Sequence, residues 1–338
     1  MMWRRQMTVG PLEFEAGGVL DSAEIVFHTS PREYKTGDRV VWICHALTGN
    51  SNPEDWWPGM VGEGKVIDPS VCYVVCVSML CSAYGACGPA SLNPSSGKPW
   101  LLDFPRTTVR DMVKAEILVR QTLGIEKVDV LIGPSIGGFQ AVEWAVMEPD
   151  VIKKLVLLAT DVRTTPYLTA FNESQRMAIK ADPSFLQAKD IHGGEEGLKC
   201  ARSIALISYR SYAGYNIRQA EKEEAIFADR ASSYQRYQGD KLVNRGFDAY
   251  SYWYLTYAFD SMNVGRGRGG VEKALSSVEA ETSVINVTSD QLFPPEAGRR
   301  NAKLIRGASY FEIESSFGHD GFLLENAQLG EIIKPIVE

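Results

Sequence analysis

Short, almost uninterrupted apolar runs recur along this sequence and constrain its fold more than any other feature. They lie at Val40–Cys44, Tyr73–Val77, Val128–Ile132, Leu155–Ala159, Ser283–Val287 and Tyr310–Ile313. Such runs do not alternate with polar residues, which is typical of strands that are buried on both faces of a parallel sheet. We therefore expect a mostly parallel sheet that is covered by other elements.

Helical patterns separate several of these runs. Thr108–Leu123 and Phe139–Met147 both repeat apolar residues at helical spacing. The alternation of strand and helix predicts an α/β sheet with right-handed crossovers and flanking helices. The segment Leu20–Phe27 alternates more openly, which predicts an antiparallel edge strand ahead of the parallel ones.

The alternation stops between about residues 163 and 270, where the chain is rich in charge, Tyr and Arg and has a mostly helical pattern. A helical insertion between two strands predicts a lid over the carboxyl edge of the sheet, where such folds bind ligands. A helical decoration on one flank is the alternative. The predicted domains are a core made of residues 1–163 and 276–338 and a helical lid at residues 164–275.

Composition argues against several classes of protein. The 338 residues are 45% hydrophobic, which is too apolar for a disordered chain. The net charge is −7 without a basic block, so nucleic-acid binding is not expected. We find neither an apolar run of membrane-spanning length nor a secretory signal. The six cysteines lie in apolar surroundings, which is typical of reduced thiols in a cytoplasmic protein.

The segment Gly133–Gly138 has the pattern G-x-S-x-G between an apolar strand and a helix. In this context a serine lies on a sharp, strained turn that exposes its hydroxyl at the sheet edge, and small neighbours let the backbone approach closely. Ser135 is therefore the predicted nucleophile. A simple glycine-flanked turn is the alternative interpretation.

A nucleophilic serine needs a base, and the base needs an orienting acid. His319 follows the run ending at Ile313, and Asp290 follows the run ending at Val287. Taken singly, they could be a loop histidine and a turn or N-cap aspartate. Together with Ser135 they follow the chain order of α/β-hydrolase triads, each just past a strand. The sequence therefore predicts an α/β-hydrolase fold with a catalytic Ser135–His319–Asp290 triad.

Two backbone N–H groups are predicted to form the oxyanion hole. One belongs to Ile136, directly after the nucleophile, and the other to Leu47, in the loop that follows Val40–Cys44. His45, which begins that loop, is interpreted as structural and not catalytic.

The remaining chemistry-bearing residues do not indicate a metal or a bound cofactor. Four cysteines at positions 72, 76, 81 and 87 lie close together, but they form no paired C-x-x-C knuckles, so a zinc site is not expected. No glycine-rich phosphate-binding motif opens a helix after a strand.

Longer motifs give the chain a specific resemblance. They include HALTGNS (45–51), DWWPGMVGEGKVIDP (55–69), YGACGPASLNPSSGKPW (84–100), GPSIGGFQAVEWAVMEPD (133–150), SYRS (208–211), SYQRYQGDKLVNR (233–245) and GHDGFL (318–323). From about residue 10 to its end, the chain resembles the homoserine O-acetyltransferases of the α/β-hydrolase superfamily.

The resemblance implies acetyl transfer from acetyl-CoA, a co-substrate, to the hydroxyl of L-homoserine in methionine biosynthesis. It implies a ping-pong cycle through acetylated Ser135, and a homodimer. It also implies that Arg210 and Tyr234 bind the substrate carboxylate and that Asp320 binds its amine. By themselves these three residues could equally be a solvated charge, a core tyrosine and a helix N-terminal charge.

Several alternatives remain open from the sequence. The family commonly has G-G-S-M-G-G or G-G-S-L-G-G at the nucleophile, whereas this chain has Pro134 and Ile136. The acceptor could be serine or another alcohol, the donor could be succinyl-CoA, or the enzyme could be an ester hydrolase. A non-catalytic binding protein of the same fold is a further alternative. Arg266 and Arg268 could contact CoA phosphates or could lie in a solvated loop.

Overall fold

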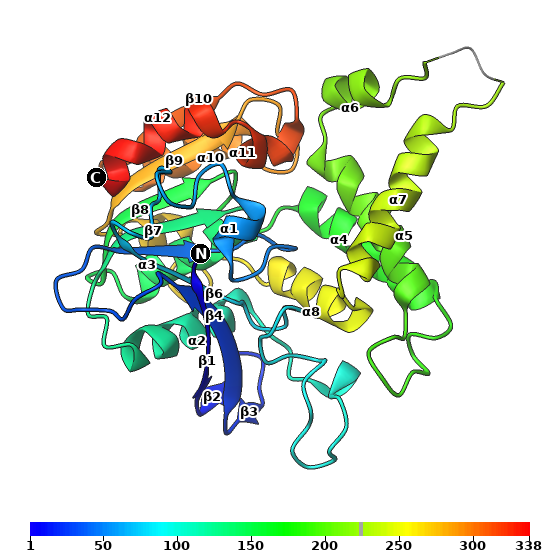
Figure 1. The fold of residues 1–338 in the computed structure, drawn as a ribbon, viewed down its shortest axis with the longest axis horizontal. Helices are drawn as coiled ribbons and strands as arrows, with labels where there is room; N and C mark the ends of the chain where they lie inside the picture. Colours follow the sequence, from blue (N-terminus) through cyan, green and yellow to red (C-terminus); the bar gives the residue numbers. More distant parts are fainter. Residues whose placement is uncertain (223–225) are drawn as a thin grey trace.

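A computed structural model describes residues 1–222 and 226–338. Within them, eight strands form one sheet in the order β1-β4-β6-β5-β7-β8-β9-β10 (Figure 1). Their bounds are β1 Trp3–Val9, β4 Ala23–Thr29, β6 Tyr73–Val77, β5 Val40–Cys44, β7 Val128–Pro134, β8 Ile152–Leu158, β9 Glu281–Val287 and β10 Ser309–Ile313. A separate small sheet pairs β2 (Leu12–Glu13) with β3 (Val19–Leu20). Each of the predicted buried strands is present. Most of them are longer than predicted by one or two residues or are shifted along the chain by a few residues.

The sheet is parallel from β6 to β10 and antiparallel at β1 and β4. The expected antiparallel strand is therefore present as β4, but its predicted position at the sheet edge is wrong. Residues Trp3–Val9 pair with β4 along their whole length and take the edge position themselves. Most side chains of this β1 strand are exposed or half-buried, so its sequence lacks the apolar run that identifies the inner strands.

Two hydrophobic cores lie on the two faces of the sheet. Along β5, Val40, Trp42 and Cys44 belong to one core, and Val41 and Ile43 belong to the other. This division follows from the alternation of side chains along a strand. Because both faces are covered, the strand sequence is a continuous apolar run, as the prediction assumed.

Helices cover both faces of the sheet. Helices α2 (Val109–Thr122) and α3 (Ile136–Met147) contribute to the first core, and α12 (Asn326–Val337) contributes to the second. Helix α2 begins where Thr108 and Asp111 form a capping box, in which each side chain accepts a hydrogen bond from the other residue's backbone N–H. The remaining short helices of the core are α1 (Pro53–Trp56), α10 (Pro295–Leu304) and α11 (Gly321–Leu324), and α9 (Val271–Leu275) precedes β9 in the inserted segment.

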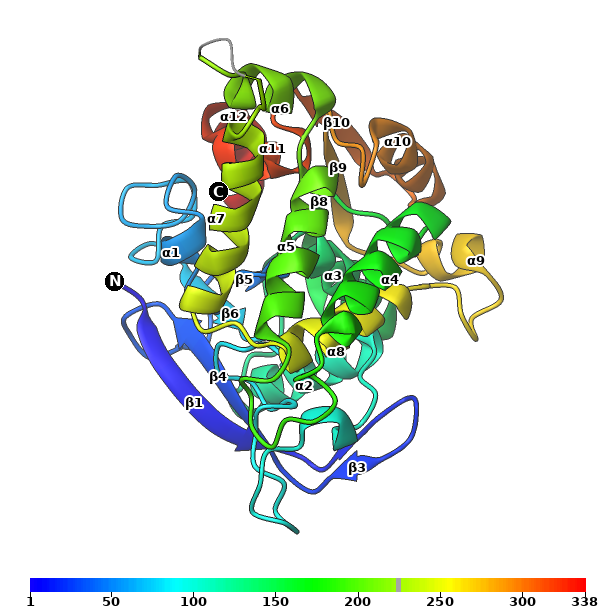
Figure 2. The ribbon, with the colours of Figure 1, turned by 90° about the vertical axis from the view of Figure 1, so that its right-hand side faces the viewer.

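The segment between β8 and β9 is helical, as predicted. Its long helices are α4 (Pro166–Ala181), α5 (Glu195–Tyr209), α6 (Tyr212–Gln219), α7 (Arg230–Asn244) and α8 (Ala249–Asp260). They gather on one side of the molecule in Figure 1, and Figure 2 shows α5 and α7 side by side in front of the sheet. Among the described residues, no helix combines the length and the apolar character needed to span a membrane.

The glycine- and arginine-rich run after α8 does not leave its arginines unpaired. Arg266 forms two hydrogen bonds to the carboxylate of Glu15, at 2.8 and 3.1 Å. Arg268 donates to the buried carboxylate of Glu143 at 2.6 Å. These ion pairs attach the run to the core.

Candidate active site

Ser135 lies on a sharp turn between β7 and α3. Its backbone has φ 57° and ψ −124°, a region that side-chain-bearing residues rarely adopt, and its side chain is buried. Gly133 and Gly137 make the turn possible, because a Cβ atom on Gly133 would strike the carbonyl oxygen of Gly137. A Cβ atom on Gly137 would strike the carbonyl oxygen of Cys44 at the end of β5. The turn therefore needs glycine at both positions.

The three predicted triad residues form one hydrogen-bonded chain. Ser135 Oγ lies 2.9 Å from His319 Nε2, and His319 Nδ1 lies 2.7 Å from Asp290 Oδ2. The other oxygen of Asp290 accepts hydrogen bonds from the backbone N–H groups of Leu292 and Phe293, at 2.8 and 3.0 Å. The carboxylate is thus held from both sides, and because it accepts from Nδ1, Nε2 is left free to accept the serine proton.

Aromatic side chains surround the His319 ring. The ring centroids of Phe293 and Phe322 lie 5.3 Å away, and that of Tyr209 lies 5.8 Å away. Tyr209 is the last residue of α5, so the helical insertion contributes directly to the surroundings of the imidazole. Sequence reasoning did not identify these neighbours, because aromatic residues in helices and loops are ordinarily core residues.

The two predicted oxyanion donors belong to neighbouring segments. Ile136 begins α3, and Leu47 lies in the loop after β5. The close approach of Gly137 to the carbonyl oxygens of Cys44 and His45 brings this loop against the first turn of α3. Within residues 1–222 and 226–338, the backbone N–H groups of Ile136 and Leu47 have no hydrogen-bond acceptor. Neither group is therefore used by another oxygen of the described residues.

Arg210, Tyr234 and Asp320 come together although they belong to three separate segments. Arg210 follows α5, Tyr234 lies on α7, and Asp320 ends a short 3₁₀ helix at Gly318–Asp320. Arg210 donates a hydrogen bond to the Tyr234 hydroxyl at 3.1 Å and forms an ion pair with Asp320. Asp320 directly follows His319, so the cluster is connected to the Ser135–His319–Asp290 chain through the backbone.

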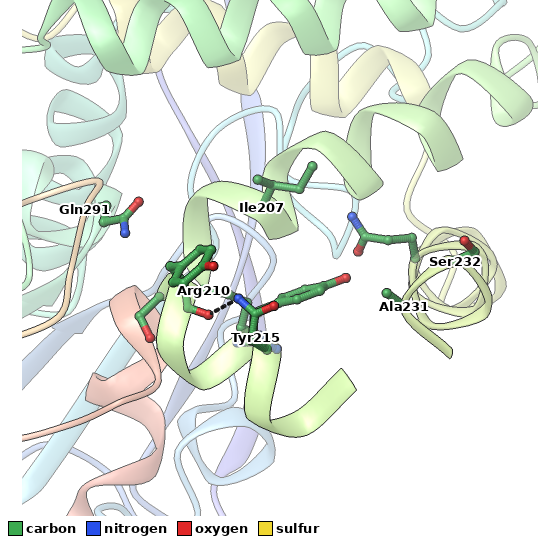
Figure 3. A pocket seen from close by; sticks show the side chains of 10 residues that line it. Ile207, Arg210, Tyr215, Ala231, Ser232 and Gln291 are labelled. Carbon is green, nitrogen blue, oxygen red and sulfur yellow. Dashed lines mark hydrogen bonds between the residues drawn. The ribbon is translucent and has the colours of Figure 1, made fainter. Parts of the chain in front are cut away.

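A cavity of about 460 Å³ opens beside this cluster (Figure 3). Arg210 and Gln291 line it, and Gln291 directly follows Asp290, whereas neither Ser135 nor His319 lines it. Helices α5, α6 and α7 supply most of its other walls, among them Ile207, Tyr215 and Ala231. The cavity therefore provides room for a ligand next to the charged cluster.

The sheet, the strained serine turn and the hydrogen-bonded Ser-His-Asp chain together define a protein of the α/β-hydrolase class. A family model described as alpha/beta hydrolase fold matches residues 39–326. The homoserine O-acetyltransferase of Cyclobacterium marinum is 41% identical to the chain over 323 residues, which cover 96% of this chain and 92% of that protein. The chain belongs to the homoserine O-acetyltransferase family.

Solved structures share the fold. The homoserine O-acetyltransferase from Bacillus anthracis superposes with a TM-score of 0.92 at 22% identity, covering 100% of this chain and 98% of the other. Esterase E22 superposes with a TM-score of 0.91 at 21% identity and covers both chains fully. The same architecture therefore occurs in proteins named as transferases and as esterases, so the fold alone does not select the acyl acceptor.

Proposed function

We propose that this protein transfers an acetyl group from acetyl-CoA to the side-chain hydroxyl of L-homoserine, through an acetylated Ser135. The observation that carries the proposal is the hydrogen-bonded Ser135–His319 pair together with the Arg210–Tyr234–Asp320 cluster, whose Asp320 is the next residue after His319. A nucleophile next to separate groups for a carboxylate and an ammonium suits an amino-acid acceptor. The chain is 41% and 38% identical to two named homoserine O-acetyltransferases over almost its whole length, which supports the same function.

The first half of the proposed cycle acylates the serine. His319 Nε2 accepts the Ser135 proton while Oγ attacks the thioester carbonyl of acetyl-CoA. Asp290 holds the Nδ1–H tautomer and stabilises the imidazolium that forms. The oxygen of the tetrahedral intermediate accepts hydrogen bonds from the N–H groups of Ile136 and Leu47. His319 then gives the proton to the sulfur as CoA leaves.

The second half transfers the acetyl group to the acceptor. The guanidinium of Arg210 and the hydroxyl of Tyr234 bind the carboxylate of homoserine, and the carboxylate of Asp320 binds its ammonium group. In the free site Arg210 and Asp320 neutralise each other, so the zwitterion replaces one ion pair by two. His319 removes the proton from the homoserine hydroxyl, whose oxygen attacks the acetyl carbonyl. The imidazolium then returns this proton to Ser135 Oγ as the bond between Oγ and the acetyl carbon breaks.

The helical insertion, residues 164–275, is proposed to act as a lid on a core formed by residues 1–163 and 276–338. Tyr209 of the insertion lies against His319, and Arg210 belongs to the charged cluster. A closed insertion would keep water from the acetyl-enzyme, which is the step that separates a transferase from a hydrolase.

The proposed partners are acetyl-CoA and L-homoserine, and acetyl-CoA acts as a co-substrate that leaves as CoA in each cycle. No permanently bound cofactor or metal is needed for this chemistry. A cytoplasmic location is proposed, because it suits an enzyme of methionine biosynthesis.

A homodimer is also proposed, and exposed apolar side chains support it. Tyr212 and Ile217 on α6 are 80% and 76% exposed, and Phe227 beyond it is 85% exposed. A second copy would cover these side chains and remove their apolar surface from water. Ile217→Asp should shift the mass measured by light scattering to that of a monomer, and a wild-type monomer would contradict the proposal.

CoA release from acetyl-CoA, measured with and without L-homoserine, tests the proposed function. We expect release that is strongly stimulated by L-homoserine and not by L-serine, that falls when succinyl-CoA replaces acetyl-CoA, and that is abolished in Ser135→Ala. Homoserine-independent release that still requires Ser135 would instead identify an ester or thioester hydrolase.

A further inference from the structure

His45 occupies a buried position at the end of β5 that the proposed chemistry does not use. Its side chain is fully buried, and both ring nitrogens have a backbone partner. Nδ1 lies 2.9 Å from the carbonyl oxygen of Ala46, and Nε2 lies 3.1 Å from the backbone nitrogen of Met79, which follows β6. The imidazole thus connects the loop after β5 to the loop after β6.

These partners determine the tautomer of the ring. The Ala46 carbonyl can only accept a hydrogen bond, so Nδ1 carries the proton. The Met79 N–H can only donate, so Nε2 is bare. Burial also lowers the pKa of His45 to about 4, so the ring is neutral at physiological pH. The bond from Met79 therefore keeps the Nδ1–H directed at Ala46.

The Ala46 carbonyl belongs to the same peptide unit as the N–H of Leu47. This carbonyl accepts a second hydrogen bond, from the N–H of Gly49 at 2.9 Å. In a planar trans peptide the C=O and N–H bonds point in opposite directions. Two hydrogen bonds to the Ala46 oxygen therefore fix the direction of the Leu47 N–H, which has no acceptor of its own within residues 1–222 and 226–338.

We propose that His45 is a positioning residue of the oxyanion hole, which holds the Ala46–Leu47 peptide so that the Leu47 N–H faces the carbonyl under attack. This inference rests on the proposed function, which assigns the Leu47 N–H to the tetrahedral intermediate. The packing of Gly137 against the carbonyl oxygens of Cys44 and His45 keeps the held peptide beside the Ser135 turn. His45 acts through Leu47 and touches no substrate.

Two substitutions at His45 test the two hydrogen bonds of the ring one at a time. In His45→Asn the side-chain amide takes the place of Nδ1 and retains the bond to Ala46. In His45→Gln the amide takes the place of Nε2, so it retains the bond from Met79 and loses the one to Ala46. The assays are kcat and KM for acetyl transfer, the rate of p-nitrophenyl acetate hydrolysis, and the melting temperature.

We expect His45→Gln to lower kcat by about 10²–10³-fold, the usual effect of losing one oxyanion donor, with KM for L-homoserine unchanged. His45→Asn should stay within about tenfold of the wild-type kcat, because the Ala46 bond remains. His28→Asn is the matched control: this half-buried imidazole bonds the Ser51 hydroxyl at 2.9 Å instead of the Ala46 oxygen, so its kcat should not change.

A purely structural role would give a different pattern. Equal losses in His45→Asn and His45→Gln, or losses that follow the melting temperature, would overturn the proposal. Hydrolysis of p-nitrophenyl acetate needs the oxyanion hole but not L-homoserine. If the wild-type protein ignored L-homoserine, the proposed acceptor would be wrong, and the order of the two His45 variants on p-nitrophenyl acetate would still decide the role of His45.

Discussion

Glu116 offers a prediction about stability that can be worked out from the structure. This α2 residue is 1% exposed, and its Oε2 accepts hydrogen bonds from Trp42 Nε1 at 2.6 Å and from Cys44 Sγ at 3.4 Å. Its other oxygen, Oε1, has no partner among the described residues. Burial raises the pKa of Glu116 from 4.5 to about 8. The carboxyl group is therefore protonated in the folded protein at neutral pH.

The sign and size of the effect follow from linkage. A raised pKa means that the folded state retains a proton that the unfolded state loses, so the contribution to stability is complete below pH 4.5. It is lost progressively as the pH rises, until the folded carboxyl group also ionises at about pH 8. At about 1.4 kcal/mol per pH unit, the total loss is about 5 kcal/mol.

Glu116→Gln removes the titration while preserving the shape of the protonated acid. The amide oxygen still accepts from Trp42 and Cys44. The variant should match the wild type near pH 4.5 and become increasingly more stable than it towards pH 8. Urea unfolding at several pH values measures this difference, and Glu126→Gln, at an exposed position after α2, is the matched control. A difference between Glu116→Gln and wild type that does not change with pH would refute the reasoning.

Three further predictions concern the site. Gly137→Ala should yield little folded protein or a markedly lower melting temperature, because the new Cβ atom meets the rigid Cys44 carbonyl; a normal melting temperature would contradict the close approach. Asp290→Asn should lower kcat by about 10⁴-fold through loss of the required tautomer, with a far-UV circular dichroism spectrum like that of the wild type, and a loss below tenfold would count against its role. Arg210→Ala should raise KM for L-homoserine by at least about tenfold and leave p-nitrophenyl acetate hydrolysis unchanged; equal effects on both reactions would exclude a role specific to the acceptor.

Local pattern by itself determined much of this protein. The inner strands and the serine turn can be predicted from the sequence because each depends on residues that are close together in the chain. Strands buried on both faces are continuous apolar runs, and the serine turn has closely spaced glycines where one backbone segment must approach another. Asp290 and His319 were identified because parallel strands end at the same edge of the sheet, so residues just past different strands meet there. Arg210, Tyr234 and Asp320 were identified by family motif and not by any local rule.

Only the tertiary structure decided the contacts between distant segments. The edge position of β1 comes from its ladder with β4, since its own side chains are mostly exposed. Only the fold shows that Arg266 and Arg268 pair with Glu15 and Glu143, which lie far from them in the sequence. The sequence predicts a structural role for His45. Its hydrogen bond to the Ala46 carbonyl depends on a second bond, from the backbone N–H of Met79 in the loop after β6, which only the fold reveals. The sequence pattern indicates which face of a helix or strand is buried, whereas the packing of distant segments determines which residues contact that face.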